Sequence, residues 1–552
     1  MSDTDREELH RRIMILRDKA QAGKIHIAEH LADDVLESLE RVRLAPDGLV
    51  DPDTVDGTVR ATALMMAHFQ DREEWKEAIS LRQVQEVYFG AIDHQFGELF
   101  QVMQERKAEP HQIAEAYVQD ANRVQEVAQN LPEFLEQIQE FWKNIADPAW
   151  IHSKDQNGIK AVYGGSLFPA GGHSIASSCG LYVDTIILPD PLLRISRLVP
   201  HWEPRRLVYE VLRFGLQILR YRSLALAEVD TPIIAIVPDK LDLEEGYSEF
   251  IHSMAEGDCL KHVSAMFGRN FESIDELQDY AKQFEQPSDL VAALANPDLL
   301  LFDTEATQTL DEQIGEYMRG EGRVFNPQRA GDIILPNFIG RMSQANDLLR
   351  RSLEFGGTPL IDAETSWRYL NWKLEYDADC VSNTDLTPLH VVRGLQSAAR
   401  NEMQWLGNIP PEALVEMRQQ GATEELREIL GRGVFDIAAS DPTNFFQTTD
   451  QVVDNIRGAF EQHQQNMTKL RNKNWKFAGV DAGSWIVIGT IEVAAALSGA
   501  PTFGLLAFAA DQLLDIPKLK ELPNKFQEIQ KEAKTIKASP VGLLFQQSKR
   551  RR

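Results

Sequence analysis

The sequence predicts a mainly helical protein with a small α/β module, in which a parallel sheet of three or more strands is set in a helical body. Through most of the chain, apolar residues recur every three or four positions, the period of an amphipathic helix. Between Gly158 and Lys240 the pattern changes to three short, nearly continuous apolar runs separated by helix-length segments. Such runs are typical of parallel strands that are covered on both faces.

The three runs cover residues 159–165, 182–191 and 231–240, and each ends in glycine or proline turn residues. Helical connections with right-handed crossovers would place the three strands side by side and parallel in one sheet. A fourth short strand is expected at residues 332–335, at the edge of that sheet.

The segments before and after these runs predict helices. A long helix is expected over residues 75–107, followed across short polar breaks by helices over 110–129 and 131–145 that pack antiparallel. Residues 204–228 predict an amphipathic helix between the second and third strands. Later helices are expected over 273–285, with Ser273 as N-cap, and over 409–421, with proline at the start and glycine at the end.

Shifts in composition divide the chain into five segments. We expect an N-terminal helical domain over residues 1–150, the α/β module over 151–245 and a second helical domain over 246–475. An apolar helical hairpin is expected over 476–516 and a basic tail over 517–552. Because few linkers are rich in proline or glycine, we expect these segments to pack together.

The charge and cysteine content exclude some classes of protein. A formal net charge of −27 and a pI near 5.0 argue against general nucleic-acid binding, which depends on Lys and Arg at phosphates. The cysteines, Cys179, Cys259 and Cys380, are widely spaced and form no CxxC pair, which fits a reducing compartment. The N-terminus is charged and has no apolar signal region. We therefore expect a cytoplasmic protein.

Aspartates at the strand ends are the first candidate site. Asp190 follows the second apolar run and Asp239 follows the third, so parallel strands would bring both carboxylates to the carboxyl edge of the sheet. Asp184, in the second run, is a third candidate. Asp190 and Asp239 could hold Mg²⁺ or Mn²⁺ for phosphoester chemistry, with Asp184 assisting. The alternative is that these aspartates only form turns and cap the following helices, with no cofactor.

A glycine pair after the first strand is the second candidate site. Gly171 and Gly172 precede Ser174 at an expected helix start, where free N–H groups could bind an anion or a cofactor phosphate. The segment has neither the GxGxxG spacing nor the Lys-Ser/Thr of a P-loop, so a capped helix start is the alternative.

The C-terminal segment suggests a helical hairpin that is either a core element of the protein or a membrane contact. The stretch that begins at Ser484 and ends at Leu514 contains only two charged residues, Glu492 and Asp511, and a Ser-Gly-Ala-Pro sequence interrupts it. Its first arm is too short for one bilayer span, which leaves a helical hairpin, either buried in the protein or inserted into a membrane. The tail that follows holds ten Lys or Arg and three Glu, consistent with an anionic partner or a solvated end.

Two stretches, LYVDTIILPDP and PIIAIVPD, joined by a long helix, resemble a pattern in large uncharacterised bacterial proteins. Some of those proteins are encoded near mobile-element and antiviral defence genes. The resemblance covers about eighty residues, and the later stretch NIPPEALVEMRQQGATEELREILG is similar to them as well. It implies a bacterial, cytosolic setting, and it assigns no catalytic residue.

Three functions remain open from the sequence. The first is a non-enzymatic scaffold or sensor component that acts on a protein partner, because no complete catalytic constellation is present; the resemblance implies antiviral defence as its setting. The second is a metal-dependent phosphoester hydrolase or nucleotide-binding enzyme that uses Asp190, Asp239 and Asp184. The third is an effector that acts on membranes through residues 484–514. The second function requires the carboxylates, or two of them with Gly165 or Gly172, to line one pocket.

Overall fold

The computed structural model describes residues 3–22, 37–169, 175–303, 307–319, 327–376, 385–472, 476–477, 480–481 and 539–540. The chain divides into two compact units. Unit 1 consists of residues 1–84 and 144–155, and unit 2 of residues 85–143 and 156–552. The predicted fold class is confirmed, since the protein is mainly helical and carries a small parallel sheet.

The α-helices are α1 (Asp3–Gln21), α3 (Gly57–Ala78), α4 (Leu81–Arg106), α5 (Pro110–Tyr117), α6 (Ala121–Asp155), α7 (Ile175–Cys179), α8 (Pro191–Ser196), α9 (Pro204–Arg220), α10 (Arg222–Ala225), α11 (Lys240–Leu243), α12 (Tyr247–Phe267), α13 (Ile274–Ala281), α14 (Pro287–Ala293), α15 (Leu310–Arg319), α16 (Ile334–Phe355), α17 (Glu364–Tyr376), α19 (Thr387–Arg400), α20 (Pro411–Gln419), α21 (Thr423–Gly431), α22 (Val434–Ser440) and α23 (Phe445–Asn472). Short 3₁₀ helices are η1 (Pro52–Thr54), η2 (Val199–His201), η3 (Pro297–Leu299), η4 (Ala330–Ile333) and η5 (Gln404–Asn408). The strands are β1 (Lys160–Tyr163), β2 (Thr185–Pro189), β3 (Ile234–Val237), β4 (Thr358–Leu360), β5 (Lys476–Phe477) and β6 (Val480–Asp481).

The central sheet of unit 2 has the strand order β3-β2-β1-β4, and all neighbouring pairs are parallel. Every residue of its strands is buried, which explains the nearly continuous apolar runs in the sequence. The three predicted strands are therefore confirmed as β1, β2 and β3, and their carboxyl ends lie at one edge of the sheet.

The predicted strand at residues 332–335 is wrong, because this segment is helical. Asp332 lies in η4, where its carboxylate accepts from the Arg329 and Gln328 N–H groups at 3.0 and 3.1 Å, and α16 begins at Ile334. These hydrogen bonds cap a helix start and leave no free backbone for a sheet edge. The fourth strand is β4, which pairs with β1.

The predicted helix over residues 75–107 is wrong as a single element, because it is broken between α3 and α4. Gln83 Oε1 accepts from the Ser80 N–H at 2.9 Å, and Ser80 Oγ accepts from the Gln83 N–H at 3.3 Å. This reciprocal cap starts a new helix. An apolar period that continues across residues 75–107 does not reveal such a break.

The predicted break near residue 130 is also wrong, since α6 runs through it without interruption. The actual break comes earlier, between α5 and α6. There, Asp120 Oδ1 accepts from the N–H groups of Asn122 and Arg123 at 3.1 and 3.2 Å and caps α6. The predicted segments 204–228, 273–285 and 409–421 are helical, but the first is divided at Tyr221 into α9 and α10, and α13 ends at Ala281. Ser273 accepts from the Glu276 N–H, as its predicted N-cap role requires.

Strand β3 is an edge strand whose free side is closed by a side chain. Gln85, fully buried on α4, donates from Nε2 to the Ile236 carbonyl at 2.7 Å and accepts from the Ile236 N–H at 2.9 Å. The amide thus replaces the missing strand neighbour at this residue and leaves neither backbone group unpaired.

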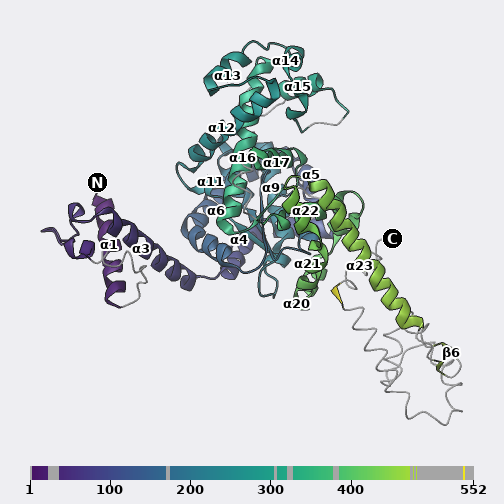
Figure 1. Ribbon diagram of the computed structural model, residues 1–552, viewed down its shortest axis with the longest axis horizontal. Helices are drawn as coiled ribbons and strands as arrows, with labels where there is room; N and C mark the ends of the chain where they lie inside the picture. Colours follow the sequence, from purple (N-terminus) through teal and green to yellow (C-terminus); the bar gives the residue numbers. More distant parts are fainter. Residues whose placement is uncertain are drawn as a thin grey trace, which may run out of the picture. The chain divides into compact units, whose positions relative to one another are not determined.

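Helices α12 and α16 pack against each other, and α16 also packs against β1 and β4. Figure 1 shows these two helices running from the sheet to a small cluster of α13, α14 and α15. One apolar core joins that cluster to α12, α16 and α17, and it includes Val263, Phe338 and Tyr369. Unit 1 has an apolar core of its own, built from α1, α3 and the segment between them, including Leu16, Val50 and Val59.

Candidate functional site

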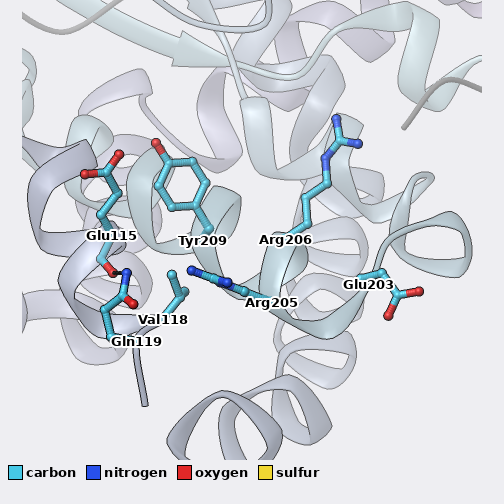
Figure 2. A pocket seen from close by; sticks show the side chains of 7 residues that line it. All are labelled: Glu115, Val118, Gln119, Glu203, Arg205, Arg206 and Tyr209. Atoms are coloured by element: carbon cyan, nitrogen blue, oxygen red, sulfur yellow. Dashed lines mark hydrogen bonds between the residues drawn. The ribbon is translucent and has the colours of Figure 1, made fainter. Parts of the chain in front are cut away.

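A shallow groove of about 370 Å³ lies between α5 and α9 in unit 2 (Figure 2). Its lining mixes acidic, basic and aromatic side chains from Glu115, Val118, Gln119, Glu203, Arg205, Arg206 and Tyr209. Figure 2 shows that these side chains point in different directions instead of converging. None of the polar side chains among these seven residues is buried. Water therefore competes for each of them, and the groove is a weak candidate for a site.

A second pocket, of about 220 Å³, lies at the carboxyl edge of the sheet, where ligands bind in open α/β proteins. We call it the carboxyl-edge pocket. Its walls come from the segments that follow β1, β2 and β3 and from α12 and α16. The lining residues are Gly164, Gly165, Ser166, Leu167, Pro189, Asp190, Arg194, Asp239, Leu241, Asp242, Ser248, Ile251, His252, Ser343, Gln344, Asp347 and Arg351.

Asp190 follows β2 directly and is almost fully buried in the wall of this pocket. Trp142 Nε1 donates to its Oδ2 at 2.6 Å, and the Leu192 N–H donates to its Oδ1 at 2.8 Å. Burial raises the pKa of Asp190 to about 6, although these hydrogen bonds act in the opposite direction. The carboxylate is therefore held in one orientation and is mostly ionised at neutral pH.

Asp239 follows β3 and lines the same pocket. Its Oδ1 accepts from the Leu241 N–H at 3.0 Å and so caps α11. Its Oδ2 accepts from Arg194 Nη2 at 2.8 Å and from Arg351 Nη1 at 3.3 Å. Burial by itself would raise the pKa of Asp239, but the Arg351 and Arg194 guanidiniums hold it below the ordinary value.

Asp347 and Arg351 lie one turn apart on α16, and their side chains are only 7% and 5% exposed. Arg351 Nη1 is 3.5 Å from Asp347 Oδ2, and the Tyr247 hydroxyl donates to Asp347 Oδ1 at 3.3 Å. Burial and the neighbouring Asp239 charge raise the pKa of Asp347 to about 7. The remaining Arg351 donors, on Nε and Nη2, reach no acceptor in the part of the chain that the structure describes.

Arg194, on α8, joins Asp239 to a further acid. Its Nε lies 3.2 and 3.1 Å from the two oxygens of Asp242. The pocket wall thus carries alternating charges in the order Asp242, Arg194, Asp239, Arg351 and Asp347. Two guanidiniums serve three carboxylates, so the charges are only partly compensated, and the pKa values of Asp242 and Asp347 are raised.

The loop after β1 contributes Gly164, Gly165, Ser166 and Leu167 to the lining of the pocket. Gly165 has a φ of +78°, and a Cβ there would lie 2.9 Å from Ser366 Cβ. A Cβ on Gly164 would lie 2.8 Å from Leu348 Cδ1 on α16. Both glycines are therefore required by the close packing of α16 and α17 on this loop. The backbone N–H groups of Gly165 and Ser166 reach no acceptor within the described residues.

Asp184 does not join the other two aspartates. It precedes β2 and so lies at the amino edge of the sheet, where it accepts from the Ile159 N–H at 2.7 Å. Arg418 Nη1 contacts its Oδ1 at 2.6 Å, and Arg427 pairs with the same oxygen. Asp190 and Asp239 do share the carboxyl-edge pocket, together with Gly165. The enzyme hypothesis required the three carboxylates, or two of them with Gly165 or Gly172, to line one pocket. Asp190, Asp239 and Gly165 do so, and Asp184 does not take part.

Other predicted positions fall outside the described residues. These are Gly171, Gly172 and Ser174, together with Cys380, the apolar stretch 484–514 and nearly all of the basic tail. The described cysteines, Cys179 and Cys259, are free and buried. In the described ranges, no group of three or more His, Cys, Asp or Glu side chains is placed to hold a metal ion. None of the helices within those ranges combines the length and apolarity needed to span a bilayer.

The sequence did not point to Arg194, Asp347 or Arg351 as site residues. Arg194 stands four residues after the Asp190 turn, so its place near the sheet edge could have been inferred. Asp347 and Arg351 have the spacing of an ordinary ion pair on a helix surface, and only the packing of α16 across the strand ends buries them.

Comparisons with protein-family models, with curated proteins and with solved structures found no match for this chain. Its assignment to a function therefore rests on the geometry of the carboxyl-edge pocket. The bacterial setting implied by the sequence resemblance stays an expectation.

Proposed function

We propose that unit 2 is a sensor module that binds a small phosphorylated ligand in the carboxyl-edge pocket. The observation that carries this proposal is Arg351. Its side chain is 5% exposed and lines the pocket, yet only Nη1 is used for bonds to Asp239 and Asp347. Its Nε and Nη2 are not among the buried polar atoms without a partner, so they open on the pocket, where an anion can replace the water that meets them. The planar fork of arginine matches the oxygens of a phosphate or carboxylate.

Two further groups of donors support an anion in the same pocket. The Gly165 and Ser166 N–H groups, in the loop after β1, are free of described acceptors. Helix α12 starts next to the pocket after Gly246, which has a φ of +78°, and it lacks a side-chain cap. Its first turn includes Ser248, which lines the pocket. Unpaired N–H groups and the positive end of a 21-residue helix favour negative charge.

The lining holds four carboxyl groups and two guanidiniums, so a ligand anion has to bind at Arg351 and away from Asp190. Asp239 and Asp242 are paired with guanidiniums. The pKa of Asp347 is about 7, so this carboxyl can take up a proton when an anion approaches Arg351. The energetic conflict between the ligand charge and the pocket acids is then limited to Asp190, which lies on the wall after β2.

The size of the pocket limits the ligand. A volume of about 220 Å³ is below the roughly 300–1,000 Å³ typical of sites that enclose drug-sized molecules. The pocket therefore suits a group of the size of a sugar phosphate, with any larger part of the ligand lying outside.

The proposal is tested by titrating the full-length protein with inorganic phosphate, ribose 5-phosphate and AMP, using calorimetry and thermal shift. We expect at least one phosphorylated compound to bind the wild type. R351Q should weaken that binding by about tenfold or more, since it removes a charge-assisted pair of hydrogen bonds. R351K keeps the charge and loses the fork, so it should give an intermediate effect.

The matched control is R418K, which alters a buried arginine at the opposite edge of the sheet. It should leave the affinity within about twofold. Failure of every phosphorylated compound to bind the wild type would overturn the proposal. So would unchanged affinity in a folded R351Q or R351K protein.

The metal-dependent hydrolase hypothesis keeps one observation in its favour, which is that Asp190 and Asp239 share a pocket. However, a divalent ion at Asp239 would have to displace Arg194 or Arg351 from Oδ2. For this reason we favour ligand binding over metal-assisted hydrolysis. A rise in melting temperature with Mg²⁺ or Mn²⁺ that is lost in D239N would reverse that preference.

A further inference from the structure

We infer that an anion bound at Arg351 causes Asp347 to take up a proton, so that the carboxyl-edge pocket responds to its ligand and to pH together. This inference rests on the proposed function and specifies how that site is regulated. It concerns the row of ionisable side chains in the pocket wall, in which Asp347 stands at one end, beside Arg351.

This row carries more acidic than basic groups. Within it, the guanidiniums of Arg194 and Arg351 lie within hydrogen-bond distance of three carboxyl groups, on Asp239, Asp242 and Asp347. The three carboxyl side chains are 3%, 3% and 7% exposed. An uncompensated charge is costly at such burial, and a proton on one of the carboxyl groups removes it. The row therefore favours one bound proton near neutral pH.

The three carboxyl groups are unequally supported by their neighbours. Asp239 accepts from two guanidiniums and one backbone N–H. Asp242 is paired with two guanidiniums, the nearer at 3.1 Å. Among the described residues, Asp347 has one guanidinium contact, with Arg351 at 3.5 Å, and one hydroxyl contact, with Tyr247 at 3.3 Å. Asp347 is thus the carboxyl group on which the proton lies, in agreement with its pKa of about 7.

Charged side chains on the elements around α16 are paired with one another. Asp258 on α12 pairs with Lys373 on α17 at 2.8 Å. Glu354 on α16 pairs with Lys240 on α11 at 2.5 Å. Further ionisable groups at α16 or the pocket are Arg350 on α16, over the Tyr247 ring, Lys160 on β1, beside Gly356, Asp190 after β2 and His252 on α12. The last two are acids or bases of the same pocket and supply the controls.

Arg351 couples the anion to Asp347. Its Nη1 contacts Asp239 and Asp347, whereas Nε and Nη2 open on the pocket. An anion at Nε and Nη2 adds negative charge to the guanidinium that supports Asp347. A like charge nearby disfavours the ionised carboxyl and raises its pKa. Solvent then supplies a proton to the Asp347 carboxylate, and no covalent bond of the ligand changes.

The experiment measures proton uptake by the full-length protein on binding sulfate and the phosphorylated compound that binds most tightly. Sulfate keeps its charge near neutral pH, and the titration of the phosphorylated compound is measured separately. Calorimetry at about pH 7.5 in buffers of different ionisation enthalpy should show uptake of roughly half a proton or more per bound anion. Affinity for sulfate should fall by about tenfold between about pH 6 and about pH 9, which corresponds to one pKa unit.

The D347N variant carries a neutral amide in place of the protonated carboxyl. Its proton uptake should be close to zero, and its affinity for sulfate should change by about twofold or less over the same pH range. H252Q and D190N are the matched controls, since each removes another ionisable group that lines the pocket. Both should keep the proton uptake and the tenfold change.

Wild-type protein that binds an anion without proton uptake would overturn the inference and leave anion binding intact. The same conclusion would follow if folded D347N kept the tenfold change, or if H252Q or D190N abolished it. Absence of binding by every phosphorylated compound would instead overturn the proposed function. Infrared difference spectra of the wild type need no variant. A bound anion should produce the carbonyl band of a protonated carboxyl group, and failure of this band to appear would also overturn the inference.

Discussion

At the residue scale, the carboxyl-edge pocket depends on ionisable side chains that are buried together. Asp347 is the clearest case, because burial and the charge of Asp239 raise its pKa to about 7 although Arg351 acts in the opposite direction. The unfolded chain has an ordinary aspartate pKa near 4. Between about pH 4 and pH 7 the folded protein therefore retains a proton that the unfolded chain releases.

This pKa difference fixes the sign of a pH effect on stability. The contribution of Asp347 is fully present below about pH 4 and is lost as the pH rises through 7. D347N has no proton to lose, so its stability relative to wild type should increase from pH 5 to pH 8 by on the order of 3 kcal/mol. Urea denaturation of both proteins at several pH values measures this difference. A difference that is constant with pH, or that decreases, would contradict the assigned pKa.

At the element scale, the turn after β1 determines how closely α16 and α17 approach the sheet edge. Gly164 and Gly165 have no side chains, and this allows Leu348 and Ser366 to pack directly on the loop. Arg351, one turn beyond Leu348 on α16, reaches Asp239 from this position. The glycine pair therefore places the arginine on which the proposed function depends.

The G165A substitution should destabilise the protein by roughly 2–4 kcal/mol, because it combines a strained positive φ with a Cβ 2.9 Å from Ser366 Cβ. The matched control is G421A, where φ is +67° and a Cβ would meet nothing within 4 Å. That change should cost only roughly 1–2 kcal/mol, from the backbone alone. Chemical denaturation compares the two. Equal losses of stability would show that packing on Gly165 is unimportant.

At the scale of the whole molecule, the chain has two compact units with separate apolar cores. Unit 1 buries Leu16 and Val59 among its own helices. The sheet of unit 2 buries Ile186 and Ile236. Each unit therefore holds the contacts required for its own cooperative unfolding.

We expect thermal unfolding in two transitions. L16A should lower the midpoint of one transition and I186A that of the other, by an amount that corresponds to roughly 2–5 kcal/mol each. Ribose 5-phosphate or AMP, if bound as proposed, should raise only the transition that I186A lowers. Differential scanning calorimetry of the two variants provides the measurement. A single transition that both variants lower equally would show that the units unfold as one.

Much of the fold could be predicted because it depends on local patterns. Three apolar runs of strand length predicted β1, β2 and β3, and helix-length connections predicted their parallel direction. Strand β4 was missed because Thr358–Leu360 is short and carries a proline, so its pairing depends on β1. The break at Ser80 was missed because the Ser80–Gln83 cap interrupts the backbone without interrupting the apolar period.

The sequence by itself determined the order of the strands along the chain, and hence that Asp190 and Asp239 would reach one edge of the sheet. This follows because the carboxyl ends of parallel strands must lie together. Only the tertiary structure decided what those aspartates contact. Helix α16 comes from a segment about a hundred residues farther along the chain, and its packing against β1 and β4 brings Arg351 to Asp239. Side chains so far apart in the sequence meet only through long-range packing. No local pattern could therefore have shown that the carboxyl edge of the sheet also holds the Arg351 guanidinium, with hydrogen-bond donors that Asp239 and Asp347 do not use.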